Sequence, residues 1–227
     1  MNFIEKKIAL FDFDGTLVAG HPWLGIAKHN LKTKKNLLPT FCYIMSHLAA
    51  APFWKAGLIS TEKYYQSWGK GLAQLLRGTD IKKAKEIFNW LADGHLLPTL
   101  KKNVFERLKK HQEDGYLIIL TSGSFQDLIE VFSSRLNIDF ALGTELEIVK
   151  NRFSGRIIPP LCFGQEKVEK VKKFLSGNGL KINFQESFAY SDSFFDLPLL
   201  ELVGHPIAVE PDKKLLRIAR NKGWSII

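Results

Sequence analysis

The sequence predicts an α/β fold, in which a parallel sheet carries helices on both faces and an all-helical segment interrupts the chain. Three observations lead to this prediction. A short apolar run at residues 8–11 has the composition of a buried strand and ends at an acidic turn. After residue 98, strand patterns alternate with helical patterns, which is typical of parallel sheets with crossover helices. Residues 20–97 contain no clear strand pattern and are expected to form a series of helices.

The composition is that of a globular protein with a hydrophobic core. The chain has 227 residues, of which 45% are hydrophobic and 24% are charged, and this size suits one α/β domain or a core domain with a large insertion. Its formal charge of +9 favours anionic partners such as phosphorylated molecules or acidic lipid headgroups. Most lysines are nevertheless expected on solvated helix faces, and no nucleic-acid-binding signature is present.

The cysteines and the first residues bear on location. Cys42 and Cys162 are the only cysteines, they lie far apart, and they lack metal-ligand spacing, which fits a reducing compartment. Residues 1–7 carry an acid and lead directly into a strand, unlike a secretory signal. We therefore expect a cytoplasmic protein, with a peripheral position at the membrane as the alternative.

The segment 20–97 is expected to contain several amphipathic helices. The first begins near His21-Pro22, and a helix at residues 98–112 is expected to lead back to the sheet. The most apolar stretch, residues 37–59, is about long enough to cross a bilayer, but prolines and polar residues interrupt it. We expect this stretch to be buried within the helical insertion, and contact with a membrane surface is the alternative.

Beyond residue 112 the expected elements alternate along the chain. We expect strands at residues 116–120, 187–190, 206–209 and 224–227, a hairpin of 140–148 with 153–158, and helices at 125–136, 166–175, 193–202 and 212–221. This alternation places helices on both faces of one sheet. The chain is therefore expected to divide into a core of residues 1–19 and 98–227 and a helical cap of residues 20–97.

Two acidic residues follow the first strand. Asp12 and Asp14 alternate around Phe13, so their side chains leave the strand on the same side, at the edge where open α/β sheets bind their ligands. Carboxylates held this close need a cation or an acid–base task. A solvated turn at the strand end is the alternative interpretation.

Three later stretches are candidates for the same edge of the sheet. Ser122 and Gly123 follow a buried strand and open a helix, which suits a phosphoryl group, although an ordinary N-cap explains Ser122 equally well. Lys167 lies early in a helix, where it can neutralise a phosphate or be one more surface lysine. Asp192 and Asp196 follow another strand and offer oxygen ligands to a hard cation such as Mg²⁺, although Asp192 can also cap the next helix.

Taken in order, these residues resemble the haloacid dehalogenase superfamily in its phosphatase branch. The run DFDGTLV, residues 12–18, matches the first motif of that family residue for residue. Ser122-Gly123 matches the second motif, Lys167 the third, and Asp192 with Asp196 the fourth. The insertion between the first and second motifs is similar to the type-1 helical cap of the phosphoserine-phosphatase-like group. The resemblance implies a Rossmann-like core.

The resemblance also implies a magnesium-dependent phosphomonoester hydrolase. In such an enzyme Asp12 is the nucleophile that forms an aspartyl-phosphate, and Asp14 is the general acid and then the base that activates water. A carboxylate nucleophile divides one difficult step into two easier ones. The implied ligands of Mg²⁺ are the side chains of Asp12 and Asp192 and the backbone carbonyl of Asp14, with Asp196 holding a metal-bound water or lying behind them. The implied phosphate-binding groups are Ser122, the Gly123 amide and Lys167.

Two departures from the family pattern bear on the substrate. Phosphoserine phosphatases carry an acidic residue shortly after the first motif, and residues 19–22 supply none; Phe195 stands where an Asn often precedes the last Asp. Residues 162–168 look like the third-motif region of bacterial phosphatidylglycerophosphate phosphatases. We expect a phosphorylated small metabolite as substrate. The alternatives are a lipid phosphate at the membrane surface and a binding module without turnover.

Overall fold

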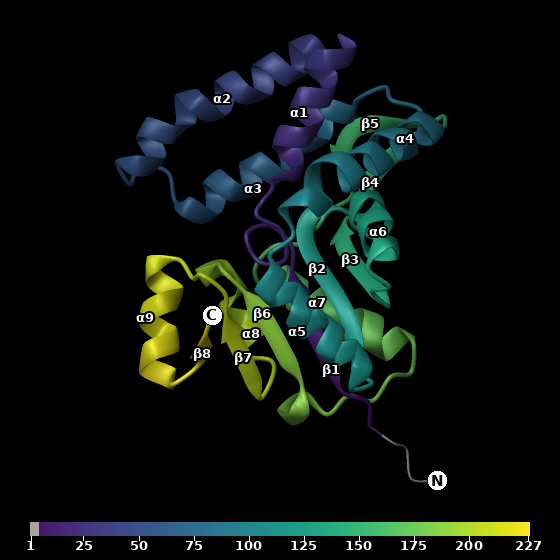
Figure 1. Ribbon diagram of the computed structural model, residues 1–227. Coiled ribbons are helices and arrows are strands. Elements are labelled where there is room, and N and C mark those ends of the chain that lie inside the picture. Colours follow the sequence, from purple (N-terminus) through teal and green to yellow (C-terminus); the bar gives the residue numbers. More distant parts are fainter. Residues whose placement is uncertain (1–4) are drawn as a thin grey trace.

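Residues 5–227 are described by the computed structural model (Figure 1). They are built around a six-stranded sheet in the order β3-β2-β1-β6-β7-β8, in which all neighbouring strands are parallel. The strands are β1 (Ile8–Asp12), β2 (Leu117–Phe125), β3 (Phe140–Thr144), β6 (Phe188–Ser191), β7 (His205–Ala208) and β8 (Ser225–Ile226). The prediction of an α/β fold with a parallel sheet is confirmed.

Strand β1 lies in the middle of the sheet, and its sequence shows why. All five of its residues are buried, as expected for a parallel strand with helices on both faces. Ile8 and Leu10 face one hydrophobic cluster, and Ala9 and Phe11 face the other, because side chains alternate along a strand. The helices that contribute to the Ile8 side are α7 (Gln165–Gly177), α8 (Leu197–Leu200) and α9 (Lys213–Lys222); those on the Phe11 side include α5 (Lys102–Glu113) and α6 (Gln126–Arg135).

Five α-helices separate β1 from β2 in the sequence. They are α1 (Pro22–Thr33), α2 (Leu37–Lys55), α3 (Thr61–Leu72), α4 (Ile81–Leu91) and then α5. In Figure 1, α1 to α3 stand beyond one end of the sheet, with α2 on the outside. The two connections to the sheet run side by side, since Val18 pairs with Leu100 and the Ala19 N–H donates to the Thr99 carbonyl at 2.9 Å. The division into a core and a cap at residues 20 and 97 stays a prediction.

Three boundaries differ from expectation. Strand β2 continues through Ser122 to Phe125, where a helix start was expected. The expected hairpin is divided: β3 pairs with β2 in the main sheet, and only β4 (Leu146–Val149) pairs with β5 (Arg152–Ile157) in a separate antiparallel ribbon. The turn dipeptide Asp93-Gly94 is expected to end the helical run that follows Asp80, but it lies within a π-helical turn, Ala92–Leu96, which continues directly from α4. Backbone pairing with distant strands decides the first two boundaries, and it leaves little trace in local sequence.

The expected burial of residues 37–59 is wrong for most of α2. The buried residues of this helix are Thr40, Tyr43 and His47, whereas Leu38 is 72% exposed and Phe41 is 62% exposed. Burial fails because the helix is the outermost layer, and its inner face alone packs on the rest of the chain. Within residues 5–227, no helix combines the length and apolar character needed to cross a membrane.

Candidate active site

The carboxyl ends of β1, β2 and β6 bring the candidate residues together. Asp12 ends β1 and is aligned with Thr121 of β2, while Phe11 is aligned with Tyr190 of β6. Ser122 and Ser191 therefore follow on either side of Asp12. This arrangement comes from parallel pairing, which places three strand ends at one edge of the sheet.

Asp12 is paired with a buried lysine that is distant in the sequence. The Lys167 ammonium nitrogen lies 2.6 Å from Asp12 Oδ1 and 2.7 Å from Asp196 Oδ2, and all three side chains are almost fully buried. Ser191 Oγ donates a further hydrogen bond of 2.8 Å to Asp196 Oδ2. Burial tends to lower the pKa of Lys167, but the two carboxylates raise it above its ordinary value, so the ammonium stays charged.

Thr16 connects the first and fourth predicted stretches. Its hydroxyl lies 2.9 Å from Asp12 Oδ2 and 2.9 Å from Asp192 Oδ1, and it accepts a hydrogen bond of 3.0 Å from the Asp192 N–H. One hydroxyl proton cannot satisfy both carboxylates at once. Sequence reasoning gave Thr16 no role; its place directly after the Asp-Gly turn was the available signal.

Gly15 allows this close approach. Its φ of +84° lies in the left-handed region, and a Cβ at this position would come within 2.4 Å of Asp192 Oδ2. A side chain would therefore be strained and would displace the Asp192 carboxylate. The glycine brings the turn after β1 against the carboxylate that follows β6.

Asp14 has a different environment from Asp12. Its closest hydrogen-bond donor is Ser122 Oγ, 3.3 Å from Asp14 Oδ2, and no lysine contacts it within the described residues. Burial, together with the charge of Asp12, raises the pKa of Asp14 to about 8. At neutral pH Asp14 therefore carries a proton that it can donate.

Ser122 and Gly123 lie in a β-strand and not at a helix N-terminus, so that part of the prediction is corrected. Helix α6 begins at Gln126, and its N-cap is Phe125. Ser122 Oγ accepts a hydrogen bond of 2.9 Å from the Ser124 N–H, and the Gly123 carbonyl accepts one of 2.9 Å from Thr144 Oγ1. The pairing of β2 with β3 shifts register between residues 121 and 125. This irregularity interrupts the ladder at Ser122 and Gly123.

Lys101 is a second lysine at this edge that sequence reasoning missed. Its ammonium nitrogen lies 2.5 Å from the Gly15 carbonyl oxygen and 2.6 Å from Glu210 Oε2, and its side chain is mostly buried. In the sequence Lys101 is one of a lysine pair at the start of a helix, so nothing local distinguishes it from Lys102, whose side chain is 90% exposed.

The donor set fits a hard divalent cation. Asp12 and Asp192 present carboxylate oxygens to the same Thr16 hydroxyl, and burial raises the pKa of both. The charge of Asp192 further raises the pKa of Asp12, and that of Asp196 further raises the pKa of Asp192. Two crowded carboxylates with one shared proton donor are the situation that a bound cation relieves. No group of three or more His, Cys, Asp or Glu side chains suited to a metal occurs in residues 5–227. The predicted Mg²⁺ ligands are not such a group, because they comprise two carboxylates, of Asp12 and Asp192, and the backbone carbonyl of Asp14.

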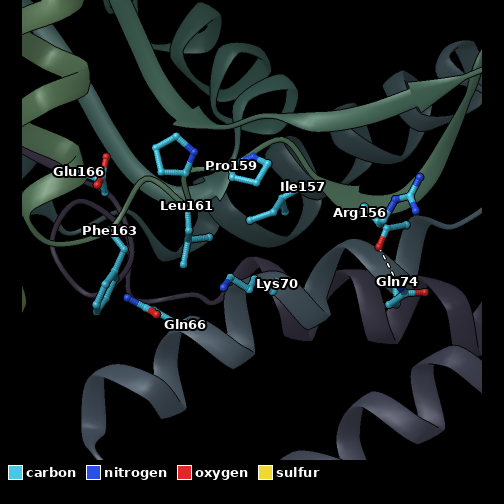
Figure 2. Close-up of a pocket in the computed structure, with 11 residues that line it drawn as sticks. Gln66, Lys70, Gln74, Arg156, Ile157, Pro159, Leu161, Phe163 and Glu166 are labelled. Atoms are coloured by element: carbon cyan, nitrogen blue, oxygen red, sulfur yellow. Dashed lines mark hydrogen bonds between the residues drawn. The ribbon is translucent and has the colours of Figure 1, made fainter.

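A pocket of about 550 Å³ lies between α3 and the segment 155–166, which leads from β5 into α7 (Figure 2). Gln66 and Lys70 of α3 line one side, and Leu161, Phe163 and Glu166 line the other. None of Asp12, Asp14, Lys167 and Asp192 lines this pocket, although Glu166 precedes Lys167 in α7. Lys70 and Glu166 give the lining charges of both signs.

The parallel sheet, the paired carboxylates at its carboxyl edge and the buried lysine define an α/β enzyme that works with carboxylate chemistry. A family model described as haloacid dehalogenase-like hydrolase matches residues 9–201. The chain belongs to this haloacid dehalogenase-like hydrolase family. The predicted family is thereby confirmed, and with it the prediction of an enzyme.

Curated relatives and solved structures agree with this assignment. A Mycobacterium tuberculosis protein named phosphoserine phosphatase SerB1 is 30% identical, over 96% of this chain and 69% of its own. A Neisseria meningitidis protein named histidinol-phosphatase is 26% identical, over 98% of each chain. A Bordetella pertussis structure of unknown function has a TM-score of 0.82 at 24% identity and covers 98% of both chains. A phosphoserine phosphatase structure has a TM-score of 0.63 at 19% identity and covers 98% of this chain and 92% of its own. Both structures show the fold.

Proposed function

We propose that the chain is a magnesium-dependent phosphomonoester hydrolase that works through an aspartyl-phosphate on Asp12. One observation carries the proposal: two neighbouring carboxyl groups have opposite surroundings. Asp12 lies 2.6 Å from the Lys167 ammonium, which favours its charged form, while Asp14 has only the Ser122 hydroxyl at 3.3 Å and a pKa raised to about 8. A carboxylate paired with an ammonium suits a nucleophile, and a neighbouring carboxyl without such a partner suits an acid.

The proposed reaction has two steps. A carboxylate oxygen of Asp12 attacks phosphorus, the bond from phosphorus to the ester oxygen breaks, and Asp14 gives its proton to the departing alkoxide. Asp14, now a carboxylate, takes a proton from water as the water oxygen attacks the phosphorus of the aspartyl-phosphate, and the bond from phosphorus to the Asp12 oxygen breaks. Inorganic phosphate leaves, and Asp12 and Asp14 return to their starting protonation states.

Other residues of the site have supporting roles in the proposal. Lys167, Ser122 and the Gly123 amide bind the oxygens of the phosphoryl group, and Asp196 holds Lys167 in place. The carboxylates of Asp12 and Asp192 and the backbone carbonyl of Asp14 would hold Mg²⁺. When bound, the cation would offset negative charge that accumulates on the phosphoryl oxygens.

A phosphorylated small metabolite is the proposed substrate class. Support comes from relatives named for small phosphate esters and from a pocket of about 550 Å³ whose lining includes Glu166, the residue before Lys167. Lys70 and Glu166 would contact charged groups of the leaving alcohol. The lack of an acid at residues 19–22 argues against phosphoserine itself.

A lipid phosphate is the second candidate substrate. The observation that favours it is the exposed apolar surface of α2, which gives an amphiphilic substrate a place to approach. A binding module without turnover would also have such a surface, but it would have no need of the Asp12–Lys167 pair beside a protonated Asp14.

The test is phosphate release from a panel of phosphorylated metabolites, lipid phosphates and a generic aryl phosphate, with Mg²⁺ or with a chelator. We expect Mg²⁺-dependent release by the wild type and none by Asp12→Asn. Asp80→Asn is the matched control, because Asp80 caps α4 and takes no part in the proposed reaction. Release from no substrate, or equal release by Asp12→Asn, would overturn the proposal.

A further inference from the structure

The outer face of α2 carries an uninterrupted apolar stripe. Leu38, Phe41, Met45, Leu48 and Pro52 follow at spacings of three and four, which places them on one face of a helix, and all five are exposed. Leu38 is 72% exposed, Phe41 and Leu48 are each 62% exposed, and Met45 is 45% exposed. We call these five residues the α2 stripe.

The opposite face of α2 accounts for how the helix is held. Tyr43 and His47 are buried there, and their rings lie 5.9 Å and 4.9 Å from the ring of Trp68 on α3. The inner face of α2 thus packs against the other cap helices. The α2 stripe lies on the opposite face, and Figure 1 shows α2 at the outer limit of the helical insertion.

Further exposed apolar residues extend the stripe at both ends of the helix. Leu31 and Leu37 precede it with exposures of 57% and 44%, and Phe53 and Leu58 follow with 54% and 76%. Single exposed apolar residues need no explanation, but a continuous apolar patch along a helix indicates a surface that is covered by a partner or a membrane.

The charge around the stripe identifies the kind of partner. Residues 20–61 contain five lysines and neither Asp nor Glu. These lysines, all exposed, are Lys28, Lys32, Lys34, Lys35 and Lys55. The first four lie on α1 and the turn before α2, and Lys55 ends α2. A long apolar face with cations at both ends is complementary to a surface that is apolar inside and anionic at its boundary.

A second copy of the chain fits this surface poorly. Two α2 stripes packed on each other would bring two sets of five lysines together, and residues 20–61 of each copy offer no carboxylate to compensate. An anionic bilayer supplies both kinds of partner that this surface needs. Its acyl chains match the apolar stripe, and its headgroup phosphates match the lysines.

We propose that the α2 stripe docks the protein on an anionic membrane surface, with α2 lying in the plane of the interface. The apolar side chains enter the boundary between headgroups and acyl chains, and the flanking lysines contact headgroup phosphates. This attachment is peripheral, and it does not depend on which phosphate ester the enzyme hydrolyses.

The experiment is co-sedimentation of the full chain with vesicles of phosphatidylglycerol and phosphatidylcholine, compared with phosphatidylcholine alone. Two substitutions on the stripe, Phe41→Gln with Leu48→Gln, are expected to weaken binding at least about tenfold, since two large apolar side chains no longer enter the interface. The matched control is Ile148→Gln with Val149→Gln, because these residues of β4 are similarly exposed, at 47% and 49%. The control is expected to bind as the wild type does.

The charge component has its own test. Lys34→Gln with Lys35→Gln is expected to weaken binding to anionic vesicles several-fold, while Lys172→Gln with Lys173→Gln, on the exposed face of α7, leaves it unchanged. Wild-type binding is also expected to fall as NaCl is raised from about 0.1 to about 0.5 M. Circular dichroism of each variant checks its fold, so that lost binding is not mistaken for unfolding.

Three results would overturn the proposal. One is absence of wild-type binding to anionic vesicles at low salt, and another is equal binding by the stripe variant and the β4 control. The third is a concentration-dependent dimer in analytical ultracentrifugation that Phe41→Gln with Leu48→Gln abolishes, when the wild type does not bind vesicles. This result would make the stripe a self-association surface. All of these measurements are made without turnover, so their outcome is separate from that of the phosphatase assay.

Discussion

Replacing Lys167 with Met tests the charge balance of the active site. Lys167 places its ammonium between Asp12 and Asp196, at 2.6 Å and 2.7 Å, in a site from which water is almost excluded. Its removal leaves two buried carboxyl groups without their cation. Breaking a buried ion pair by removing one partner costs about 3–5 kcal/mol, and we expect a loss of this size at pH 8.

The loss should depend on pH in a definite direction. Burial raises the pKa of Asp12 and of Asp196, and without Lys167 both would rise further. A carboxyl whose pKa is higher in the folded than in the unfolded state destabilises the fold as pH rises above about 4, because the unfolded state releases its proton first. We therefore expect the cost of Lys167→Met to fall to roughly 1–2 kcal/mol at pH 5.

Urea unfolding of the wild type and the variant at pH 5 and pH 8 measures this difference. Lys173→Met is the matched control, because Lys173 lies on the same helix with its side chain exposed, and we expect little change at either pH. Adding Asp196→Asn to Lys167→Met should recover part of the stability at pH 8, because one stranded charge is removed. Equal destabilisation by the two lysine variants, or a loss independent of pH, would refute the reasoning.

Three further predictions concern activity. Asp14→Asn should lower kcat about 10²–10⁴-fold for alkyl phosphates and much less for an aryl phosphate, whose leaving group needs no acid. In the wild type, kcat for alkyl phosphates should decline above about pH 8, because Asp14 loses the proton that it donates. Gly15→Ala should lose activity and affinity for Mg²⁺. The control is Gly115→Ala, where φ is a similar +75° and no atom lies near the added Cβ; urea unfolding should show only a loss of stability of about 1–2 kcal/mol. Lys70→Met should lower kcat/KM about tenfold for substrates with an anionic leaving group and leave aryl phosphate hydrolysis unchanged, with Lys63→Met of the same helix as control; equal effects on both substrates would contradict a role in the pocket.

Much of the active site was predictable because the information is local. Asp12, Asp14 and Gly15 fall within four residues at the end of one strand, and alternation is enough to place both carboxylates on one side. The parallel sheet was predictable for a similar reason, since strand and helix patterns alternate clearly after residue 98. Together these two inferences place the carboxylates at the correct edge of the fold.

Long-range contacts account for what the sequence did not reveal. Lys167 is 155 residues from Asp12, and nothing local shows that Asp196 is its second partner. The bridging hydroxyl of Thr16 appears only when the strand that leads to Asp192 is placed beside β1. The exposure of α2 has the same origin: an apolar helix is buried only where another layer covers it, and the sequence of the helix does not contain that layer.

The hydrogen bonds around Lys101 restrict where the helical insertion can move. The Lys101 N–H donates to the Leu17 carbonyl at 2.9 Å, and its ammonium contacts the Gly15 carbonyl and Glu210. The second connection is thereby fastened to the loop that follows Asp12. Residues 15–20 and 99–101 therefore form one hydrogen-bonded unit beside the active site. We expect a motion of α1 to α3 that leaves the carboxylates in place to bend at the edge of this unit, near His21-Pro22 and the π-helical turn Ala92–Leu96.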